Sequence, residues 1–442
     1  MQKASWIVTG LFVLWGMGAV GIAVDLASAA RAQSSAAGSL LTKEGRHIRL
    51  VTDLPDSPQL NEYVAAFDAA VPHWAAYWQL APERLQEWRV TAFLMDDKQA
   101  FVARGMLPRA LPDFPNGYQA GDRIWIVNKP SVYYTRHLLL HEGTHAVTWW
   151  LFGGTGPAWY MEGTAELLGT HRWTVDPRTG AATLTLASMP ANRGEVPDWG
   201  RIELVARGRQ QQQVPTIETV MRYSDTAHRD VEPYAWSWLA VTLLEMYPEY
   251  RVPLRAAAIN GSDRSPQFTR AFYQQLQAQW PVLAARWRLL THDIEYGFDA
   301  SRHQVDLSPQ PGLTAAAALS MRLDVAHGWQ VAPFTLAAGQ QVEVSAGGRF
   351  TIRDAPQRWE AEADGVTIEY HRGEPLGRLL ACVLPLKPVT GRYLPELEVV
   401  AIGHSATVTA TEASWLLLKI NEPAAALADN EGQLELRFRS QP

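Results

Sequence analysis

The feature that most constrains this chain is a pair of histidines four positions apart inside a long apolar run. His141 and His145 enclose Glu142 in the segment LLLHEGTHAVTWW. Positions i and i+4 lie on one face of an α-helix, so both imidazoles reach the same point if this segment is helical. Ser131 is a suitable N-cap, and two glycines follow soon after Trp150. We therefore predict a helix from Ser131 to Trp150.

Buried histidines need a partner, and a cation supplies one. On a helix, His-Glu-x-x-His is typical of zinc hydrolases, where Glu142 would lie beside the ion and hold a water. Zinc in a hydrolase takes three protein ligands. The next predicted helix, after Pro157, carries Glu162 and Glu166 one turn apart. We predict that Glu162 is the third ligand and that Glu166 accepts the outer N–H of a ligand histidine.

Other interpretations of these residues remain open at this stage. The two histidines also suit a core in which their ring nitrogens are satisfied by the fold, or a metal site without activity. Glu166 also suits a solvated charge on a helix surface. We interpret His137, one turn before His141, as ordinary helix surface.

The order of predicted elements indicates an α+β fold. Apolar patterning predicts strands at 47–52, 89–95 and 123–128, whereas residues 104–120 are rich in Pro and Gly and indicate a loop. Apolar residues at helical spacing predict the remaining helices of this half, at 59–79, 157–168, 234–247 and 265–291.

The pattern changes after Asp299. A Pro- and Gly-rich segment at 308–312 indicates a linker, and short strands begin at 321. Short strands between Gly, Pro and Asn turns predict a β-sandwich. The predicted strands are at 341–344, 366–370, 379–384, 406–409, 415–420 and 434–438.

The histidine motif followed by EGTAE at 162–166 resembles the gluzincin metallopeptidases. More closely, residues 47–295 are similar to a bacterial peptidase-MA-like family of largely uncharacterised members, with Gly117-Tyr118 before a strand and YAWSWL at 234–239. This resemblance implies a thermolysin-like zincin domain with an N-terminal mixed sheet and a helical C-terminal part. It also implies that Glu162 binds zinc and that strand 123–128 is the edge that binds substrate backbone.

The resemblance also implies a mechanism. Zinc lowers the pKa of an attacking water to about 7. Glu142 takes the proton and passes it to the leaving amine. The developing oxyanion needs a second donor, for which Tyr234 is the candidate, because relatives carry a tyrosine near the start of the matching helix. His228 is the alternative donor.

Residues 321–440 resemble the bacterial galactose-binding calcium lectins, which are jelly-roll-like β-sandwiches. The likeness rests on GWQ at 328–330, GEPLGRL at 373–379 and LLLKINE at 416–422. It implies that Glu422, Asp429 and Asn430 bind Ca²⁺ and that the module binds a glycan or a cell-surface component. Glu422 stands where the lectins have Asp, and Asp429 where they have Asn. The alternative is a sandwich that packs on the peptidase domain or docks to a surface.

Residues 1–32 predict a secretory signal cleaved after Ala32, because Lys3 precedes an apolar stretch and small residues follow it. An uncleaved anchor over 6–24 is the alternative. The single cysteine, Cys382, excludes an internal disulfide and a Cys-based zinc site and is expected to be a buried small hydrophobe. A net charge of −6 without a basic run argues against nucleic-acid binding.

The sequence thus predicts a signal peptide at 1–32, a zincin domain at 33–299, a linker at 300–320 and a lectin-like β-sandwich at 321–442. The predicted function is a periplasmic or extracellular zinc metallopeptidase that acts on peptides or proteins. The alternative is a secreted carbohydrate- or surface-binding protein whose zincin scaffold is inactive. Substrate identity, endo- or exo-cleavage and oligomeric state are not encoded in recognisable motifs.

Overall fold

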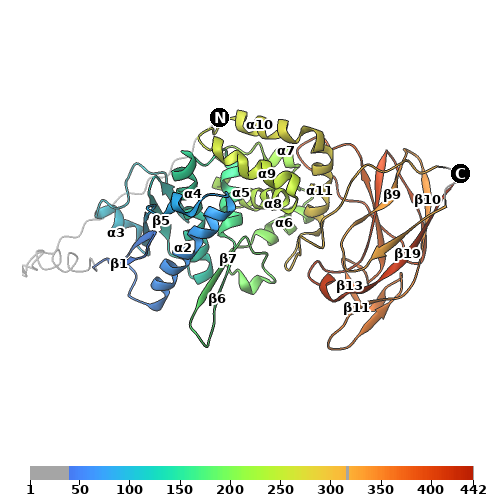
Figure 1. Ribbon diagram of the computed structural model, residues 1–442, viewed down its shortest axis with the longest axis horizontal. Coiled ribbons are helices and arrows are strands. Elements are labelled where there is room, and N and C mark those ends of the chain that lie inside the picture. The colour runs from blue at the N-terminus through green and yellow to red at the C-terminus, as the bar shows by residue number, and fades with distance from the viewer. Residues whose placement is uncertain (1–38, 315–317, 442) are drawn as a thin grey trace, which may run out of the picture. The chain divides into compact units, whose positions relative to one another are not determined.

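The computed structural model describes residues 39–314 and 318–441 (Figure 1). These residues form both helices and sheets, which confirms the α+β prediction. The predicted signal segment 1–32 and the alternative anchor over 6–24 lie outside the described residues. Within the described ranges, no helix combines the length and the apolar character that a membrane span requires.

A five-stranded mixed sheet forms the N-terminal part of the described chain. Its order is β1-β2-β3-β5-β4, with β2, β3 and β5 parallel and both outer strands antiparallel to their neighbours. The strands are β1 (Leu41–Glu44), β2 (Ile48–Thr52), β3 (Val90–Met95), β4 (Gly117–Ala120) and β5 (Arg123–Val127).

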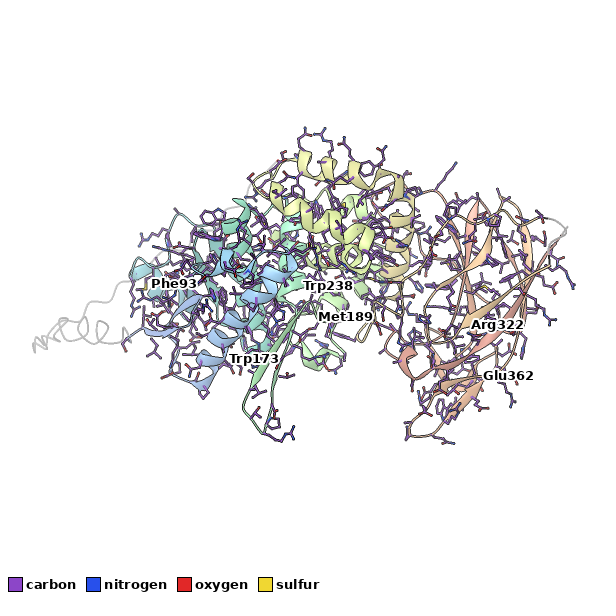
Figure 2. All side chains as sticks on the ribbon, in the orientation of Figure 1. Phe93, Trp173, Met189, Trp238, Arg322 and Glu362 are labelled. Atoms are coloured by element: carbon purple, nitrogen blue, oxygen red, sulfur yellow. The ribbon has the colours of Figure 1, made fainter. Side chains whose placement is uncertain are left out.

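Side chains alternate between the two faces of this sheet, as the pleat requires. On β3, Ala92 and Leu94 face the large core under helices α2 (Pro58–Tyr77) and α4 (Val132–Phe152). Phe93, labelled in Figure 2, belongs to a smaller core on the other face. That core is covered by α3 (Lys98–Ala103).

The edge strand of the sheet differs from the prediction. We expected 104–120 to be a loop and 123–128 to be the edge, but β5 is paired on both sides, by β3 and β4. The edge strand beside β5 is β4, which begins at Gly117, and β1 is the opposite edge. The four residues of β4 are too short to show an alternating pattern, and the Pro- and Gly-rich residues before them indicated a loop.

The α4 helix begins and ends as predicted. The Ser131 side chain accepts a hydrogen bond from the Tyr134 backbone, and Gly153 ends the helix in the left-handed region at φ 73°. Gly143 lets α4 approach α2 closely, because a Cβ there would lie 2.7 Å from Phe67 and 2.8 Å from Trp74.

Helix α5 follows α4 after a short turn, and further helices build the part beyond it. They are α5 (Ala158–Gly169), α6 (Arg201–Gln210), α7 (Ile217–Val220), α8 (Glu232–Met246), α9 (Pro248–Ala256), α10 (Pro266–Leu276) and α11 (Trp280–Asp293). The helix predicted over 265–291 is thus two helices. Proline is tolerated in the first turn of a helix but not in its interior, and Pro281 lies in the first turn of α11. The α6 helix and the hairpin β6 (His171–Val175) and β7 (Ala182–Leu186) were not predicted.

Two antiparallel sheets share a core in the C-terminal part, coloured orange to red in Figure 1. Phe334 on one sheet meets Phe438 on the other, with ring centroids 5.0 Å apart. All six predicted strands are present within these sheets or beside them. The strands are β8 (Ala318–Asp324), β9 (Gln330–Leu336), β10 (Gln341–Gly347), β11 (Phe350–Arg353), β12 (Trp359–Ala361), β13 (Val366–His371), β14 (Glu374–Leu376), β15 (Leu379–Pro385), β16 (Val399–Ala401), β17 (Ser405–Thr409), β18 (Ser414–Ile420) and β19 (Glu431–Ser440).

Helix α11 covers the outer face of the sheet that contains β15 and β18. Leu289 of α11 shares a core with Cys382 and Trp415, and Leu307 from the predicted linker joins them. Cys382 is fully buried, as expected for a small hydrophobe. The chain from Leu40 onward forms one unit by its contacts, and the domain limits at 299 and 321 remain predictions.

Candidate metal centre

Helices α4 and α5 run antiparallel and carry the candidate ligands on their facing sides. His141 lies opposite Glu162, and His137 lies opposite Glu166 and Gly169. Gly163 permits a close approach of α5 to α8, because a Cβ there would lie 2.5 Å from the Ser237 carbonyl oxygen. The helix pair therefore brings residues from two distant motifs to one buried point.

Three candidate donor atoms form a small triangle at this point. His141 Nε2 lies 3.1 Å from His145 Nε2 and 3.1 Å from Glu162 Oε2, and His145 Nε2 lies 3.5 Å from the same oxygen. Zinc bonds of 2.0–2.1 Å at tetrahedral angles place neighbouring ligand atoms about 3.3 Å apart. The triangle therefore fits three ligands of one tetrahedral ion, with the fourth position left for water or substrate.

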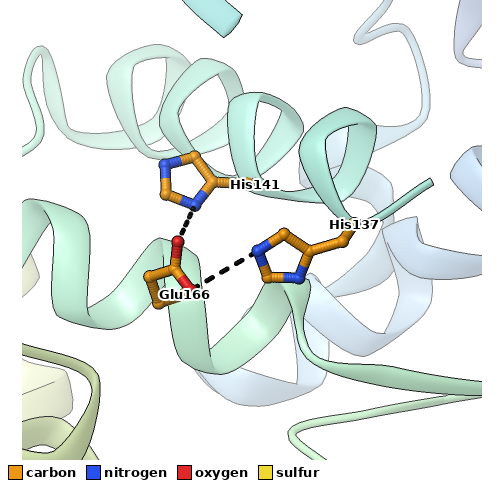
Figure 3. A group of neighbouring side chains, drawn as sticks. All are labelled: His137, His141 and Glu166. Carbon is orange, nitrogen blue, oxygen red and sulfur yellow. Dashed lines mark ion pairs between the residues drawn. The ribbon is translucent and has the colours of Figure 1, made fainter. Parts of the chain in front are cut away.

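Glu166 lies between His141 and His137, as Figure 3 shows. Its carboxylate is 3.4 Å from His141 Nδ1 and 3.4 Å from His137 Nε2. Arg201 donates from Nη2 to Glu166 Oε1 at 2.9 Å and from Nε to Oε2 at 3.0 Å, and Trp199 Nε1 donates at 3.2 Å. Arg201 and Trp199 therefore hold the Glu166 carboxylate in place, within 3.4 Å of the outer nitrogen of His141.

Two sequence-based interpretations need correction here. His137 is fully buried, so its assignment to the helix surface is wrong. The reason is that α5 returns across this turn of α4 and covers it. The alternative of a solvated Glu166 is also excluded, since its exposed fraction is 1%.

A second group of possible ligands consists of His137, His141 and Glu166. This group is the less suitable metal site, because the Arg201 guanidinium already neutralises the Glu166 carboxylate and would repel a cation. In the group His141, His145 and Glu162, the ion pairs of Glu162 within the described residues are with histidines alone. A metal ion at that group would have to displace only a proton shared with the histidines. It would not have to compete with the positive charge of an arginine.

The pKa values of the group show the competition between burial and charge. Burial lowers the pKa of His141, but hydrogen bonds to Glu162 and Glu166 outweigh it and raise the pKa to about 10. Burial raises the pKa of Glu162, and its bonds to His141 and His145 outweigh that effect and hold it well below the usual range. The site thus retains a proton that a metal ion would displace on binding.

Glu142 lies beside the triangle without joining it. Its exposed fraction is 6%, and burial raises the pKa of its carboxyl, while His141 and His145 oppose that shift. A Cβ added at Gly117 of β4 would overlap Glu142 Oε1. The edge strand therefore passes directly over this carboxylate, which a larger residue at 117 would displace.

Tyr234 and His228 both lie near the triangle. The Tyr234 ring centroid is 6.2 Å from that of His141 and 4.8 Å from that of His228, with the Arg201 guanidinium 5.6 Å away. Burial, with Glu162, raises the pKa of Tyr234, so its hydroxyl stays protonated. Burial lowers the pKa of His228, whose Nδ1 is buried without a partner.

Sequence reasoning missed Arg201 and Trp199, which hold Glu166, and the strand that carries Gly117. Arg201 follows a glycine at the start of a polar helix. The sequence alone therefore suggests that its side chain is exposed to solvent. Its partner lies 35 residues away in the chain, so no local signal marks it.

The three calcium candidates occupy different environments. Glu422 and Asn430 are buried, and Asn430 Nδ2 donates to Glu422 Oε2 at 2.6 Å. Asp429 is exposed and accepts from the Asp354 backbone at 3.3 Å. Glu422 Oε1 and Asn430 Oδ1 are buried oxygens without a partner among the described residues.

Replacing Glu166 with glutamine is expected to lower zinc affinity by about 10–100-fold, the usual cost of losing an outer partner of a ligand histidine. The neutral amide stabilises the His141 N–H less than the carboxylate does. Competition with a zinc chelator measures the change, with the exposed Glu87→Gln as the matched control. An unchanged affinity in a folded Glu166→Gln variant would contradict the assigned role.

No protein-family model matches this chain. No curated protein matches it either. Three solved structures show distant likeness. A PllA-like lectin, the N-terminal domain of EclA, is 15% identical over 28% of this chain and 95% of its own, with a TM-score of 0.21. PliG of Aeromonas hydrophila, a periplasmic inhibitor of g-type lysozyme, is 13% identical over 32% of this chain and 98% of its own, with a TM-score of 0.15. IMPa metallopeptidase in complex with T-antigen is 9% identical over 90% of this chain and 42% of its own, with a TM-score of 0.16.

Proposed function

We propose that this chain is an exported zinc metallopeptidase whose residues 33–299 form a thermolysin-like zincin domain. The observation that carries the proposal is the convergence of His141 Nε2, His145 Nε2 and Glu162 Oε2 within 3.5 Å of one another. Residues 1–32 are the export signal in this proposal, 300–320 the linker and 321–442 a lectin-like β-sandwich.

The chain's own residues supply the remaining chemistry. His141, His145 and Glu162 would hold the zinc ion, which would act as a Lewis acid and lower the pKa of a bound water to about 7. Glu142 is charge-coupled to His141, His145 and Glu162 and is not among the grouped donor atoms, so in this proposal it takes a proton from the water without binding the ion. It then delivers the proton to the leaving nitrogen. Its burial favours this role, because a carboxyl with a raised pKa is a stronger base.

The substrate backbone would lie along β4, the edge that passes over Glu142. Backbone hydrogen bonds to an edge strand hold a peptide in extended form and expose its carbonyl to the site. Tyr234 is the proposed donor to the developing oxyanion, and its raised pKa keeps the hydroxyl protonated for that role. His228 is the alternative donor.

Incubation of the purified chain with a mixed peptide library tests this proposal. We expect new cleavage products that disappear after zinc is chelated and return when zinc is added. Peptides that stay intact with a zinc-loaded, folded chain would contradict the proposal and favour the alternative, a binding protein with an inactive zincin scaffold.

A specific observation favours a second function for the C-terminal part. Glu422 Oε1 and Asn430 Oδ1 are buried without partners, and unpaired buried oxygens of this kind suit a hard cation. We propose a Ca²⁺ site at Glu422 and Asn430, with Asp429 at its exposed side, through which this part binds a glycan or cell-surface component. The alternative is a purely structural sandwich.

Replacing Glu422 with glutamine is expected to remove a pH-dependent loss of stability. Burial raises the pKa of Glu422 from 4.5 to about 8, so the folded chain holds more protons than the unfolded chain between these values. The unfolding free energy therefore falls as pH rises through this range, by on the order of 5 kcal/mol. Without Ca²⁺, Glu422→Gln should melt higher than the parent at pH 8.5 and equally at pH 4.5.

Added Ca²⁺ should raise the melting temperature of the parent at pH 8.5 and leave that of Glu422→Gln unchanged. The exposed Glu412→Gln is the control and should behave as the parent. Identical melting of parent and Glu422→Gln at both pH values would refute the buried, protonated carboxyl.

A further inference from the structure

A cavity of about 300 Å³ lies where α6 and α11 meet the C-terminal strands, far along the chain from the metal centre residues. Its wall includes Arg209 of α6, Arg288 of α11 and Arg372 from the turn between β13 and β14. Glu396 and His292 are its other ionisable wall residues. The wall itself therefore holds three arginines and one carboxylate, and Asp293 and Glu295, which are not wall residues, lie 3.7 Å and 3.8 Å from Arg372.

Arg288 is the most informative of these residues. Its exposed fraction is 9%, and its Nε is buried without a hydrogen-bond partner. Its side chain forms no ion pair within the described ranges 39–314 and 318–441. Glu412 acts on Arg288 electrostatically without forming an ion pair, and burial still lowers the pKa of the guanidinium. A buried guanidinium without a direct partner is unfavourable, because its lost hydration is not replaced. An anion in the cavity would replace it.

The surroundings of the other two arginines also favour a negatively charged ligand. Arg209 donates from Nη1 to the carbonyl oxygens of Thr291 and Ile294, which fixes its guanidinium at the wall. Burial, and next to it the charge of Arg372, lowers the pKa of Arg209 to about 10. A bound anion would relieve this repulsion between like charges.

The chain itself engages Arg372 through Nη1, which lies 3.1 Å from His292 Nδ1, and its carboxylate partners are more distant. Arg372 lies 3.7 Å from Asp293 and 3.8 Å from Glu295. Asp293 is already engaged by Lys419 at 2.8 Å and by His292 at 2.7 Å. The Arg372 guanidinium therefore retains donors for a ligand at the mouth of the cavity.

We propose that this cavity binds a small molecule with an oxyanion group (carboxylate, phosphate or sulfate) and an apolar body. Guanidinium groups match planar and tetrahedral oxyanions with paired N–H donors. The apolar body follows from Val214, Leu394 and Leu397, which line the same cavity. The site is independent of the proposed peptidase activity.

Calorimetric titration of the full chain tests this proposal, with inorganic phosphate, sulfate, benzoate and phenyl phosphate as separate probes at equal ionic strength. We expect saturable binding of at least one of them, with phenyl phosphate tighter than inorganic phosphate. Arg288→Met, which keeps the volume and removes the charge, should weaken that binding at least about tenfold. The exposed Arg322→Met on β8, labelled in Figure 2, is the matched control and should bind as the parent.

Arg372→Gln gives a second measure at a position that is 31% exposed, where folding is not at stake. It should also weaken binding, and it decides the matter if Arg288→Met does not fold. Phosphate that binds instead at the metal centre would be insensitive to both variants. That result would overturn the proposal. So would the absence of saturable binding for every probe up to about 10 mM, because a real site for small ligands of this size binds more tightly than that.

Discussion

Replacing Glu142 with alanine is expected to leave zinc content unchanged and to lower peptide hydrolysis by about 10²–10⁴-fold, the usual contribution of a general acid–base group. The carboxylate lies beside the donor triangle and is not part of it, so the ion keeps all three ligands. Zinc analysis and kcat/KM on one cleaved peptide, measured on the same preparation, check both halves of this prediction.

Glu87→Ala is the control for this variant, because Glu87 is exposed and far from the ligands in sequence. Hydrolysis that survives in a zinc-loaded Glu142→Ala chain would remove the peptidase mechanism. Loss of zinc in that variant would instead show that Glu142 is a ligand and that the triangle is misassigned.

Replacing His145 with alanine is expected to lower zinc affinity more than Glu166→Gln does. Loss of an outer partner costs about 10–100-fold, and loss of a ligand should cost more. His145 supplies one of the three donor atoms, and its loss leaves two. Chelator competition measures the affinity, with the exposed His73→Ala as the matched control.

His137→Ala separates the two groups that could hold an ion. If the ion sits among His141, His145 and Glu162, His137→Ala should bind zinc more tightly than His145→Ala does. If it sits among His137, His141 and Glu166, the order reverses. The reversed order would refute the ligand set proposed for this chain.

The ligand helices were predictable because their signals are local. The α4 helix could be predicted from the spacing of His141 and His145 and from the Ser131 N-cap. The turn after Gly153 allowed the next helix to run antiparallel to α4. Glu162 and Glu166 lie one turn apart, so a single helix face accounts for both positions. In the structure Glu162 lies 3.1 Å and Glu166 3.4 Å from nitrogens of His141, and their roles at a metal ion remain predictions.

The residues that support the ligands were not predictable, because their partners are distant in the chain. Arg201 meets Glu166 across 35 residues, and His137 is buried only because α5 covers it. Strand β4 has four residues, too few for an alternating pattern. The arginine-lined cavity joins positions 209, 288 and 372, which no sequence pattern links.

Zinc K-edge absorption on the purified chain, with zinc stoichiometry, tests the central claim most directly. We predict one zinc per chain, bound by nitrogen and oxygen at about 2.0–2.1 Å with two imidazoles and no sulfur. In His141→Ala, zinc content should fall and the imidazole signal should be lost. A parent chain that takes up no zinc, or a His141→Ala chain that keeps its zinc with two imidazoles, would contradict the claim.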